Sequence, residues 1–217
     1  RRYFTNFAKQ NKKRFYEKRC LRQNDISGYA WRTLGLMGAG RGTGVTHLAV
    51  WAANYLTSVK REKTAVLEWN DHGDFMRIGS FCEKNLNAGV PYEILNVDYY
   101  PQAGAGELAD CLNGDYQYII MDYGEITKQR FLDCSRCDKK VIVGSLSEWQ
   151  AEAFLEIIKE GQQRDKSWQH VLVFGSEETR KELEKRFRIS VRRVPASMDA
   201  FVVTHIGIRF FTELLQD

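Results

Sequence analysis

The sequence has little proline, no linker-like stretch and no long apolar run, and each absence excludes a class of protein. With three prolines and no Ser/Gly-rich segment among 217 residues, we find no internal domain boundary after about residue 28. No apolar run approaches the roughly 20 residues that a membrane-spanning helix needs. A content of 43% hydrophobic and 28% charged residues excludes a disordered chain. One sizeable globular domain is therefore expected.

The sequence also lacks the cysteine spacing of a disulfide framework or of a complete zinc site. Its five cysteines are irregularly spaced, which is typical of proteins of a reducing cytosol. Only Cys134 and Cys137 form a C-x-x-C pair, and a zinc site would need two further ligands nearby. We therefore favour two ordinary thiols near a helix end over a metal or redox site.

Positive charge is concentrated at the N-terminus. Residues 1–22 carry a net charge of +8, whereas the rest of the chain carries −4. We interpret residues 1–28 as a basic, helical N-terminal arm and residues 29–217 as a single domain. The arm Arg1–Arg22 interleaves aromatic with basic side chains, so we expect it to pack on the acidic body or on a second subunit. The alternatives are contact with a membrane surface or a partner protein and, ranked after these, nucleic-acid binding. Because the chain begins with Arg1 and not Met, it can be a fragment of a longer protein.

Beyond the arm, short apolar runs alternate with amphipathic stretches of helical spacing. The expected strands are 31–37, 64–69, 93–97, 116–121, 140–143, 171–174 and 191–194. The expected helices are 44–59, 75–83, 107–112, 128–134, 148–160, 177–187 and 201–215. This alternation predicts a three-layer α/β fold, in which a mostly parallel sheet has helices on both faces.

A glycine-rich loop is expected where the first strand meets the first helix. Backbone N–H groups and a helix N-terminus bind phosphate at such a junction, and glycines permit the tight path of the loop. Alignment with the P-loop motif places Ala39 at the first Gly, Val45 at the Lys and Thr46 at the magnesium ligand. The alternative is a glycine-rich turn without a ligand. The candidate nucleotide-binding residues are Gly40, Arg41, Gly42, Thr43, Gly44, Val45, Thr46 and His47.

With this loop, the order of elements resembles that of the ParA/MinD-type P-loop ATPases. Arg41 falls at the signature-Lys position of that family, and Asn70 falls at the second Asp of its Asp-x-Asp pair. The run Tyr118–Asp122 is similar to the Walker B strand. Gly175 stands where the family has an Asn that contacts adenine. Among family members, the TadZ/CpaE-like branch looks most similar.

The resemblance implies ATP and Mg²⁺ as cofactors and assigns roles to particular residues. It makes Thr46 and Asp122 the magnesium ligands and leaves Asp122 and Asn70 as the catalytic candidates. Losing the loop Lys removes a cation from the phosphates, although the guanidinium of Arg41 can replace it. An amide at position 70 cannot accept a proton as a carboxylate does, so turnover is expected to fall.

Two histidines near the loop have both functional and structural interpretations. His72, between Asp71 and Asp74, can be a base or a ligand, but we favour a cluster that caps the next helix through one of its carboxylates. His47 can reach a bound phosphate, and a partly buried structural histidine is the alternative.

Together these observations predict a degenerate ParA/MinD-like protein that acts as a positioning or assembly scaffold, with weak or no ATP hydrolysis. The alternatives are a slow Mg-dependent ATPase that uses Arg41 in place of the loop Lys, and a nucleotide-free interaction module. The resemblance further implies a bacterial, cytoplasmic homodimer, peripheral at the inner membrane face if the arm binds lipid, with a protein partner of unknown identity.

Overall fold

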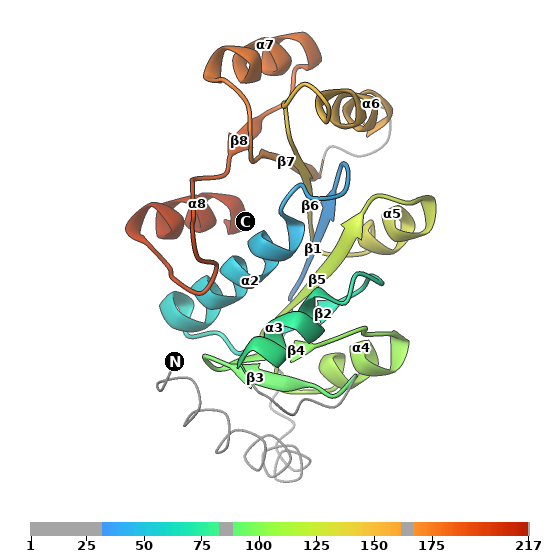
Figure 1. The fold of residues 1–217 in the computed structure, drawn as a ribbon, viewed down its shortest axis with the longest axis vertical. Coiled ribbons are helices and arrows are strands. Elements are labelled where there is room, and N and C mark those ends of the chain that lie inside the picture. Colours follow the sequence, from blue (N-terminus) through green and yellow to red (C-terminus); the bar gives the residue numbers. More distant parts are fainter. Residues whose placement is uncertain (1–31, 83–88, 162–166, 217) are drawn as a thin grey trace.

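The computed structural model describes residues 32–82, 89–161 and 167–216, and the predicted basic arm lies outside these ranges. Within them, eight strands form one sheet in the order β3-β4-β2-β5-β1-β6-β7-β8 (Figure 1). The pairs between neighbours are parallel except β3–β4. The strands are β1 (Arg32–Gly38), β2 (Thr64–Glu68), β3 (Tyr92–Ile94), β4 (Val97–Tyr100), β5 (Tyr118–Glu125), β6 (Lys139–Gly144), β7 (Trp168–Leu172) and β8 (Val191–Arg193).

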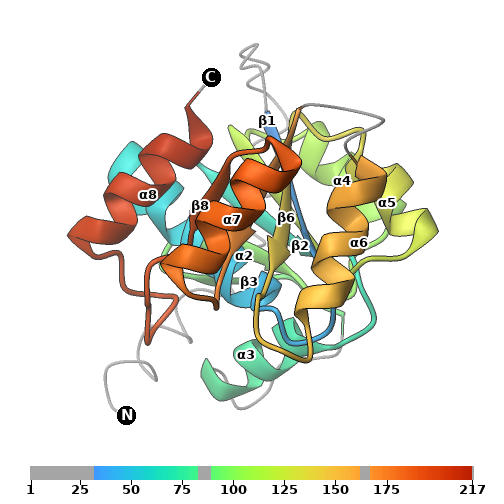
Figure 2. The same cartoon turned by 90° about the horizontal axis from the view of Figure 1, so that it is seen from above.

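Helices cover both faces of this sheet, as the sequence predicts (Figure 2). One face packs against α2 (Val45–Tyr55), α3 (Asp74–Cys82) and α8 (His205–Leu215). The other packs against α4 (Ala105–Leu112), α5 (Lys128–Cys134), α6 (Ala151–Gly161) and α7 (Glu177–Phe187). Side chains alternate between the two cores along β1, because successive residues of a strand point to opposite faces. The predicted three-layer α/β class is therefore confirmed.

The long helix expected over residues 44–59 changes character before its end. The α-helix stops at Tyr55, and a π-helical turn, η2 (Leu56–Lys60), carries the chain to Arg61 in the left-handed conformation. The following strand, β2, then starts at Thr64 with every residue buried. A strand buried on both faces is typical of a central parallel strand.

The strand predicted over residues 93–97 is wrong, because a hairpin turn interrupts it. Leu95 and Asn96 both have positive φ values, 50° and 64°, so the chain reverses direction between β3 and β4. Tyr92 consequently pairs with Tyr99, and their rings stack with centroids 5.3 Å apart. The aromatic residues of this segment therefore serve sheet packing.

Two predicted helices begin later than their apolar spacing suggests. The helix predicted from residue 148 begins at Ala151, which leaves Trp149 outside the helix and 81% exposed. The helix predicted from residue 201 begins at His205, where Thr204 caps it by accepting a hydrogen bond from the N–H of Gly207. The bends that precede these helices leave apolar side chains exposed.

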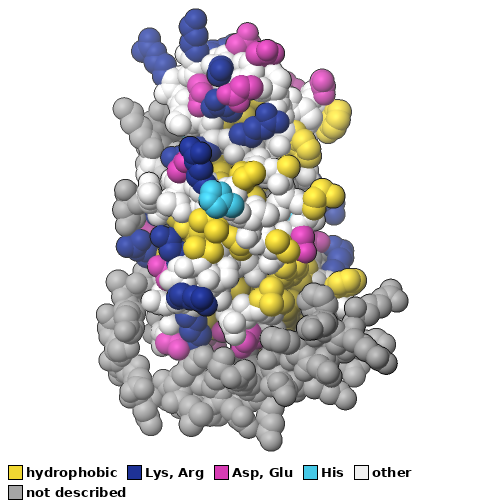
Figure 3. Space-filling view, turned by 90° about the vertical axis from the view of Figure 1, so that its left-hand side faces the viewer, with side chains coloured by type: hydrophobic (Ala, Val, Ile, Leu, Met, Phe, Trp, Pro, Cys, Tyr) yellow, Lys and Arg dark blue, Asp and Glu magenta, His cyan; other side chains and the backbone are white. Residues whose placement is uncertain are grey.

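Further apolar side chains are exposed on the face formed by α2 and α8. Figure 3 shows this face, with apolar side chains among the charged ones. Val202 is 52% exposed and Ile206 is 64% exposed, both beside the start of α8. Among the described residues, we find no helix with the length and hydrophobicity that crossing a membrane requires.

Candidate functional site

The loop between β1 and α2 has the geometry of an anion cradle. Gly42 and Gly44 adopt left-handed φ values of 75° and 84°, which side chains with a Cβ rarely tolerate. A Cβ added at Gly40 or Gly42 would meet no atom within 4 Å, so the space beside the loop is open. In the described part of the chain, the backbone N–H groups of residues 40–44 donate no hydrogen bond. Unpaired N–H groups at the start of a helix favour a bound anion.

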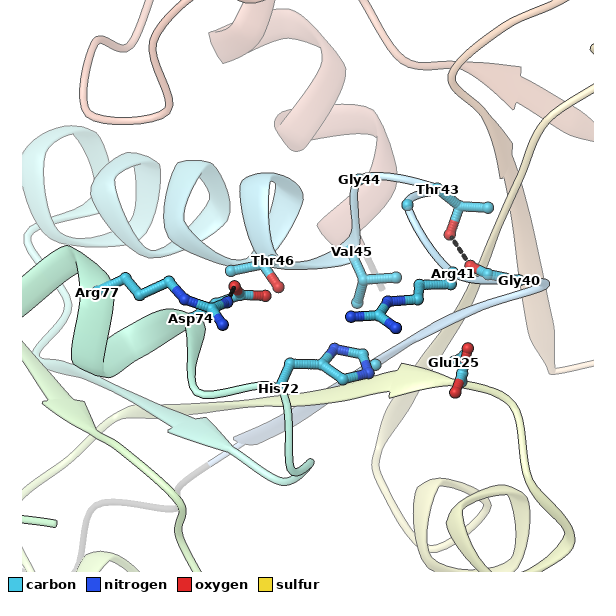
Figure 4. Close-up of a pocket in the computed structure, with 12 residues that line it drawn as sticks. Gly40, Arg41, Thr43, Gly44, Val45, Thr46, His72, Asp74, Arg77 and Glu125 are labelled. Carbon is cyan, nitrogen blue, oxygen red and sulfur yellow. Dashed lines mark hydrogen bonds and ion pairs between the residues drawn. The ribbon is translucent and has the colours of Figure 1, made fainter. Parts of the chain in front are cut away.

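The loop forms one wall of a cavity of about 320 Å³. The opposite wall consists of the segment that leads into α3 and of the end of β5 (Figure 4). Seven of the eight candidate nucleotide-binding residues line this cavity, together with residues that are far away in the sequence. The lining residues are Gly40, Arg41, Gly42, Thr43, Gly44, Val45, Thr46, His72, Asp74, Arg77, Gly124 and Glu125.

The two predicted magnesium ligands are in direct contact. The Thr46 hydroxyl donates to Asp122 Oδ2 at 2.7 Å, and the N–H of Gly124 donates to Asp122 Oδ1 at 2.9 Å. Asp122 is completely buried, and this burial raises the pKa of its carboxyl to about 6, against the opposing effect of the two hydrogen bonds. A hydroxyl beside a carboxylate at a phosphate cradle is a donor set that fits Mg²⁺. A cation bound there would favour the ionised carboxylate.

Asn70 uses both ends of its amide to join two elements. Its Nδ2 donates to the carbonyl oxygen of Asp122 at 2.9 Å, and its Oδ1 accepts from the N–H of His72 at 2.9 Å. An aspartate at this position would have no hydrogen to donate to that carbonyl. The sequence suggested a catalytic candidate here, whereas the observed bonds tie the end of β2 to β5.

The first turn of α3 is capped by a residue that the sequence analysis did not single out. Glu68 Oε1 accepts from the N–H groups of Asp74 (2.6 Å) and Phe75 (3.2 Å), and its Oε2 accepts from that of Gln102 (3.1 Å). The expected cap by Asp71 or Asp74 is therefore wrong. The Asp71 carboxylate instead pairs with Arg130 at 2.8 Å. An acidic residue directly after the apolar run of residues 65–67 was the available signal for Glu68.

Arg41 is exposed at the mouth of the cavity. Its carbonyl oxygen accepts from Gln150 Nε2 at 3.2 Å. Among the described residues, its guanidinium has neither an ion pair nor a hydrogen bond. Val45, in the Lys position, is only 6% exposed, and its Cγ2 would lie 2.8 Å from a Cβ added at Gly38. The loop therefore offers the cation of Arg41 and no other.

His47 is the one candidate binding residue that does not line the cavity within the described chain. Its ring contacts Trp51, with centroids 6.3 Å apart. Its Nε2 is buried without a hydrogen-bond partner in the described residues, and burial lowers the pKa of the imidazole. The helix directs this side chain away from the phosphate cradle, which favours the structural interpretation.

Two further sequence features have packing explanations. A Cβ added at Gly175 would lie 2.8 Å from the Cβ of Leu146, so this backbone leaves no room for an asparagine there. Cys134 and Cys137 are buried, and their sulfur atoms would lie 2.5 and 3.0 Å from a Cβ added at Gly35. Among the described residues, no group of three or more His, Cys, Asp or Glu side chains is placed to hold a metal ion.

Several solved structures share this fold. The septum site-determining protein MinD of Pyrococcus horikoshii, complexed with Mg-ADP, aligns with a TM-score of 0.62 and 14% identity over 85% of this chain and 94% of its own. A ParA family ATPase of Chlorobium tepidum aligns with a TM-score of 0.55 and 17% identity over 86% and 92%. A chain of the MinC:MinD cell division protein complex of Aquifex aeolicus aligns with a TM-score of 0.53 and 15% identity over 77% and 82%. No protein-family model and no curated protein matches the sequence.

Proposed function

Because the chain has the fold of the ParA and MinD ATPases, we propose that it binds Mg-ATP at the loop of residues 40–46 and hydrolyses it slowly or not at all. The observation that carries the proposal is the contact between Thr46 and Asp122 beside an open cradle of unpaired N–H groups. The MinD of P. horikoshii is known with Mg-ADP, which is consistent with nucleotide binding by this fold.

Each wall of the cavity has a distinct role in this proposal. The N–H groups of the loop bind the phosphates, and the positive end of the α2 dipole adds to their attraction. Thr46 and Asp122 hold the magnesium ion, which neutralises phosphate charge. The Arg41 guanidinium, which has no ion pair or hydrogen bond with the described residues, pairs with phosphate oxygens in place of the missing Lys.

Slow hydrolysis follows from the side chains that this site lacks. Val45 brings no cation to the phosphates, so developing charge at the reacting phosphate is less well stabilised. Asn70 cannot accept a proton from an attacking water, and its amide is already committed to Asp122 and His72. A carboxylate that both aligns water and accepts its proton is therefore missing from the position where the ParA/MinD pattern has one.

A site that retains nucleotide suits a positioning or assembly scaffold, which we propose as the cellular role, in a homodimer that binds a second protein. A MinD of A. aeolicus is known in complex with MinC. In this chain, Trp149, Phe174 and Met198 follow β6, β7 and β8 and are 81%, 61% and 102% exposed. Large apolar side chains exposed on the loops that follow three neighbouring parallel strands are typical of a protein-binding edge.

A thermal-shift titration with ATP and Mg²⁺ tests nucleotide binding. A ligand at about 100 times its Kd adds roughly 2.7 kcal/mol to the free energy of unfolding, which raises Tm by several degrees. Arg41→Ala is expected to reduce this rise, whereas Arg136→Ala, a change at an exposed arginine remote from the cavity, leaves it intact. No rise at millimolar ATP would contradict the proposal and favour a nucleotide-free interaction module. A rise accompanied by rapid phosphate release would favour an ATPase.

A further inference from the structure

Basic side chains approach the cavity from two opposite walls. Arg41 belongs to the loop, whereas His72 and Arg77 belong to the segment that connects β2 to α3 and to α3 itself. Figure 4 shows Arg41, His72 and Arg77 around the same space, with Thr46 between the two arginines. The wall that faces the loop therefore carries a guanidinium of its own.

The present partner of Arg77 is a weak one. Arg77 Nη1 lies 2.6 Å from Asp74 Oδ1, one helical turn away, and the two side chains are 72% and 37% exposed. Exposed ion pairs between neighbouring residues of a helix contribute little to stability, because water screens them and both side chains lose freedom. A phosphate oxygen in the cavity competes readily with this carboxylate, since a guanidinium binds phosphate with two parallel hydrogen bonds.

The main chain of this wall is fixed in place before any ligand binds. Glu68 holds the N–H groups of Asp74 and Phe75, and Asn70 holds that of His72. The His72 ring lies directly over Gly124, since a Cβ added there would come within 2.9 Å of its Cε1. Because Arg77 already lines the cavity, a rotation of its side chain on this fixed main chain is enough to turn it from Asp74 toward a ligand.

We propose that Arg77 supplies from α3 a second cation beside that of Arg41, by exchanging Asp74 for the terminal phosphate of a nucleoside triphosphate. This inference rests on the proposed function. Phosphates bound by the loop N–H groups would line one wall, and the phosphate chain would extend across the cavity toward α3. A diphosphate ends closer to the loop, so Arg77 makes the site select a triphosphate over a diphosphate. His72, on the same wall, adds a ring N–H contact to the terminal phosphate.

Asp74, the present ion-pair partner of Arg77, is expected to limit the preference for a triphosphate over a diphosphate. Its carboxylate competes for Arg77 and repels an approaching phosphate, and Glu125 adds a second negative charge to the cavity lining. Replacing Asp74 with asparagine removes the competitor but leaves its backbone bond to Glu68 in place. The variant Asp74→Asn is therefore expected to bind a triphosphate more tightly, in the direction opposite to Arg77→Ala.

Isothermal titration calorimetry of the full 217-residue chain with AMPPNP or ADP, each with Mg²⁺, tests the inference. Arg77→Ala is expected to raise the Kd for AMPPNP about tenfold and the Kd for ADP less than about threefold. Asp74→Asn is expected to lower the Kd for AMPPNP severalfold, and Arg136→Ala, remote from the cavity, to change neither value. Thermal unfolding without nucleotide checks that Arg77→Ala, a change at a largely exposed side chain, folds normally.

The outcomes separate this inference from the proposed function. If wild type binds both nucleotides and Arg77→Ala leaves the ratio of the two Kd values unchanged, the inference is overturned and the proposed function stands. If wild type binds neither nucleotide, both are overturned. If Arg77→Ala weakens AMPPNP selectively and Asp74→Asn strengthens it, the inference is supported.

Discussion

Asn70 offers the sharpest test of how this site differs from an active ATPase. The substitution Asn70→Asp restores the carboxylate of the ParA/MinD pattern but removes the donor that Asn70 presents to the carbonyl oxygen of Asp122. That carbonyl oxygen still accepts a hydrogen bond from the N–H of Trp69 at 2.8 Å, so it retains a hydrogen-bond partner. The new carboxylate also retains the N–H of His72, and a charged acceptor strengthens that bond.

The expected change in the free energy of unfolding follows from these hydrogen bonds. One lost hydrogen bond costs about 1 kcal/mol, and placing a carboxylate against a carbonyl oxygen and close to the buried Asp122 adds to that cost. We expect Asn70→Asp to lower the free energy of unfolding by about 1–3 kcal/mol at pH 7, equivalent to a Tm lower by roughly 2–4 °C per kcal/mol. The same repulsion raises the pKa of the new carboxyl, so more of it is protonated at pH 4 than at pH 7; the protonated carboxyl can donate, and the difference shrinks.

Urea unfolding of wild type and Asn70→Asp at both pH values measures this difference, and phosphate release measures turnover in parallel. Asn96→Asp introduces the same charge at an exposed turn and is expected to change stability by less than about 0.5 kcal/mol. We expect Asn70→Asp to increase phosphate release, because a carboxylate can orient water and accept its proton. Equal stability of wild type and Asn70→Asp at pH 7 would refute the assignment of Asn70 as a tie between β2 and β5.

Two further predictions concern the sheet. Burial lowers the pKa of His170 to about 4 from 6.5, so the unfolded chain binds more protons between these values. The free energy of unfolding is therefore unaffected by His170 above pH 6.5 and falls as the pH falls toward 4, by an amount on the order of 3 kcal/mol. Urea midpoints measured across this range should fall less steeply in His170→Gln than in wild type. Gly35→Ala places a methyl group 2.5 Å from Cys134 Sγ and should cost about 1–3 kcal/mol. The double variant with Cys134→Ala should recover part of this loss, and additive costs would contradict the predicted clash.

The layered fold was predictable because it depends on local patterns. Short apolar runs alternating with helical spacing are enough to indicate a parallel sheet between helices. The error over residues 93–97 arose because the turn is formed by Leu95 and Asn96, and Leu is not a residue that signals a turn. Trp149 was assigned to a helix because it fits the apolar period, although Ser147 and Gln150 bond within the bend that precedes the helix.

The candidate site was predictable only in the part that lies within one loop. Thr46 and Asp122 could be paired from motif positions, and they are in contact. The roles of Glu68 and Asn70 depend on partners that lie on other elements, which no local pattern specifies. The orientation of His47 depends on how α2 packs against the sheet, so adjacency to Thr46 in sequence was a poor guide.

The carboxylate of Glu68 joins the two faces of the sheet mechanically. One oxygen holds the start of α3, the other holds the N–H of Gln102, and the carbonyl of the same residue accepts from the N–H of Ala103 at 2.9 Å, just before α4. The helices α3 and α4 lie on opposite faces of the sheet. A displacement of one of them therefore either breaks the hydrogen bonds of Glu68 or moves the other helix with it. A protein that displaces α4 on binding would therefore shift the start of α3, where Asp74 and Arg77 line the phosphate cavity, without touching the cavity.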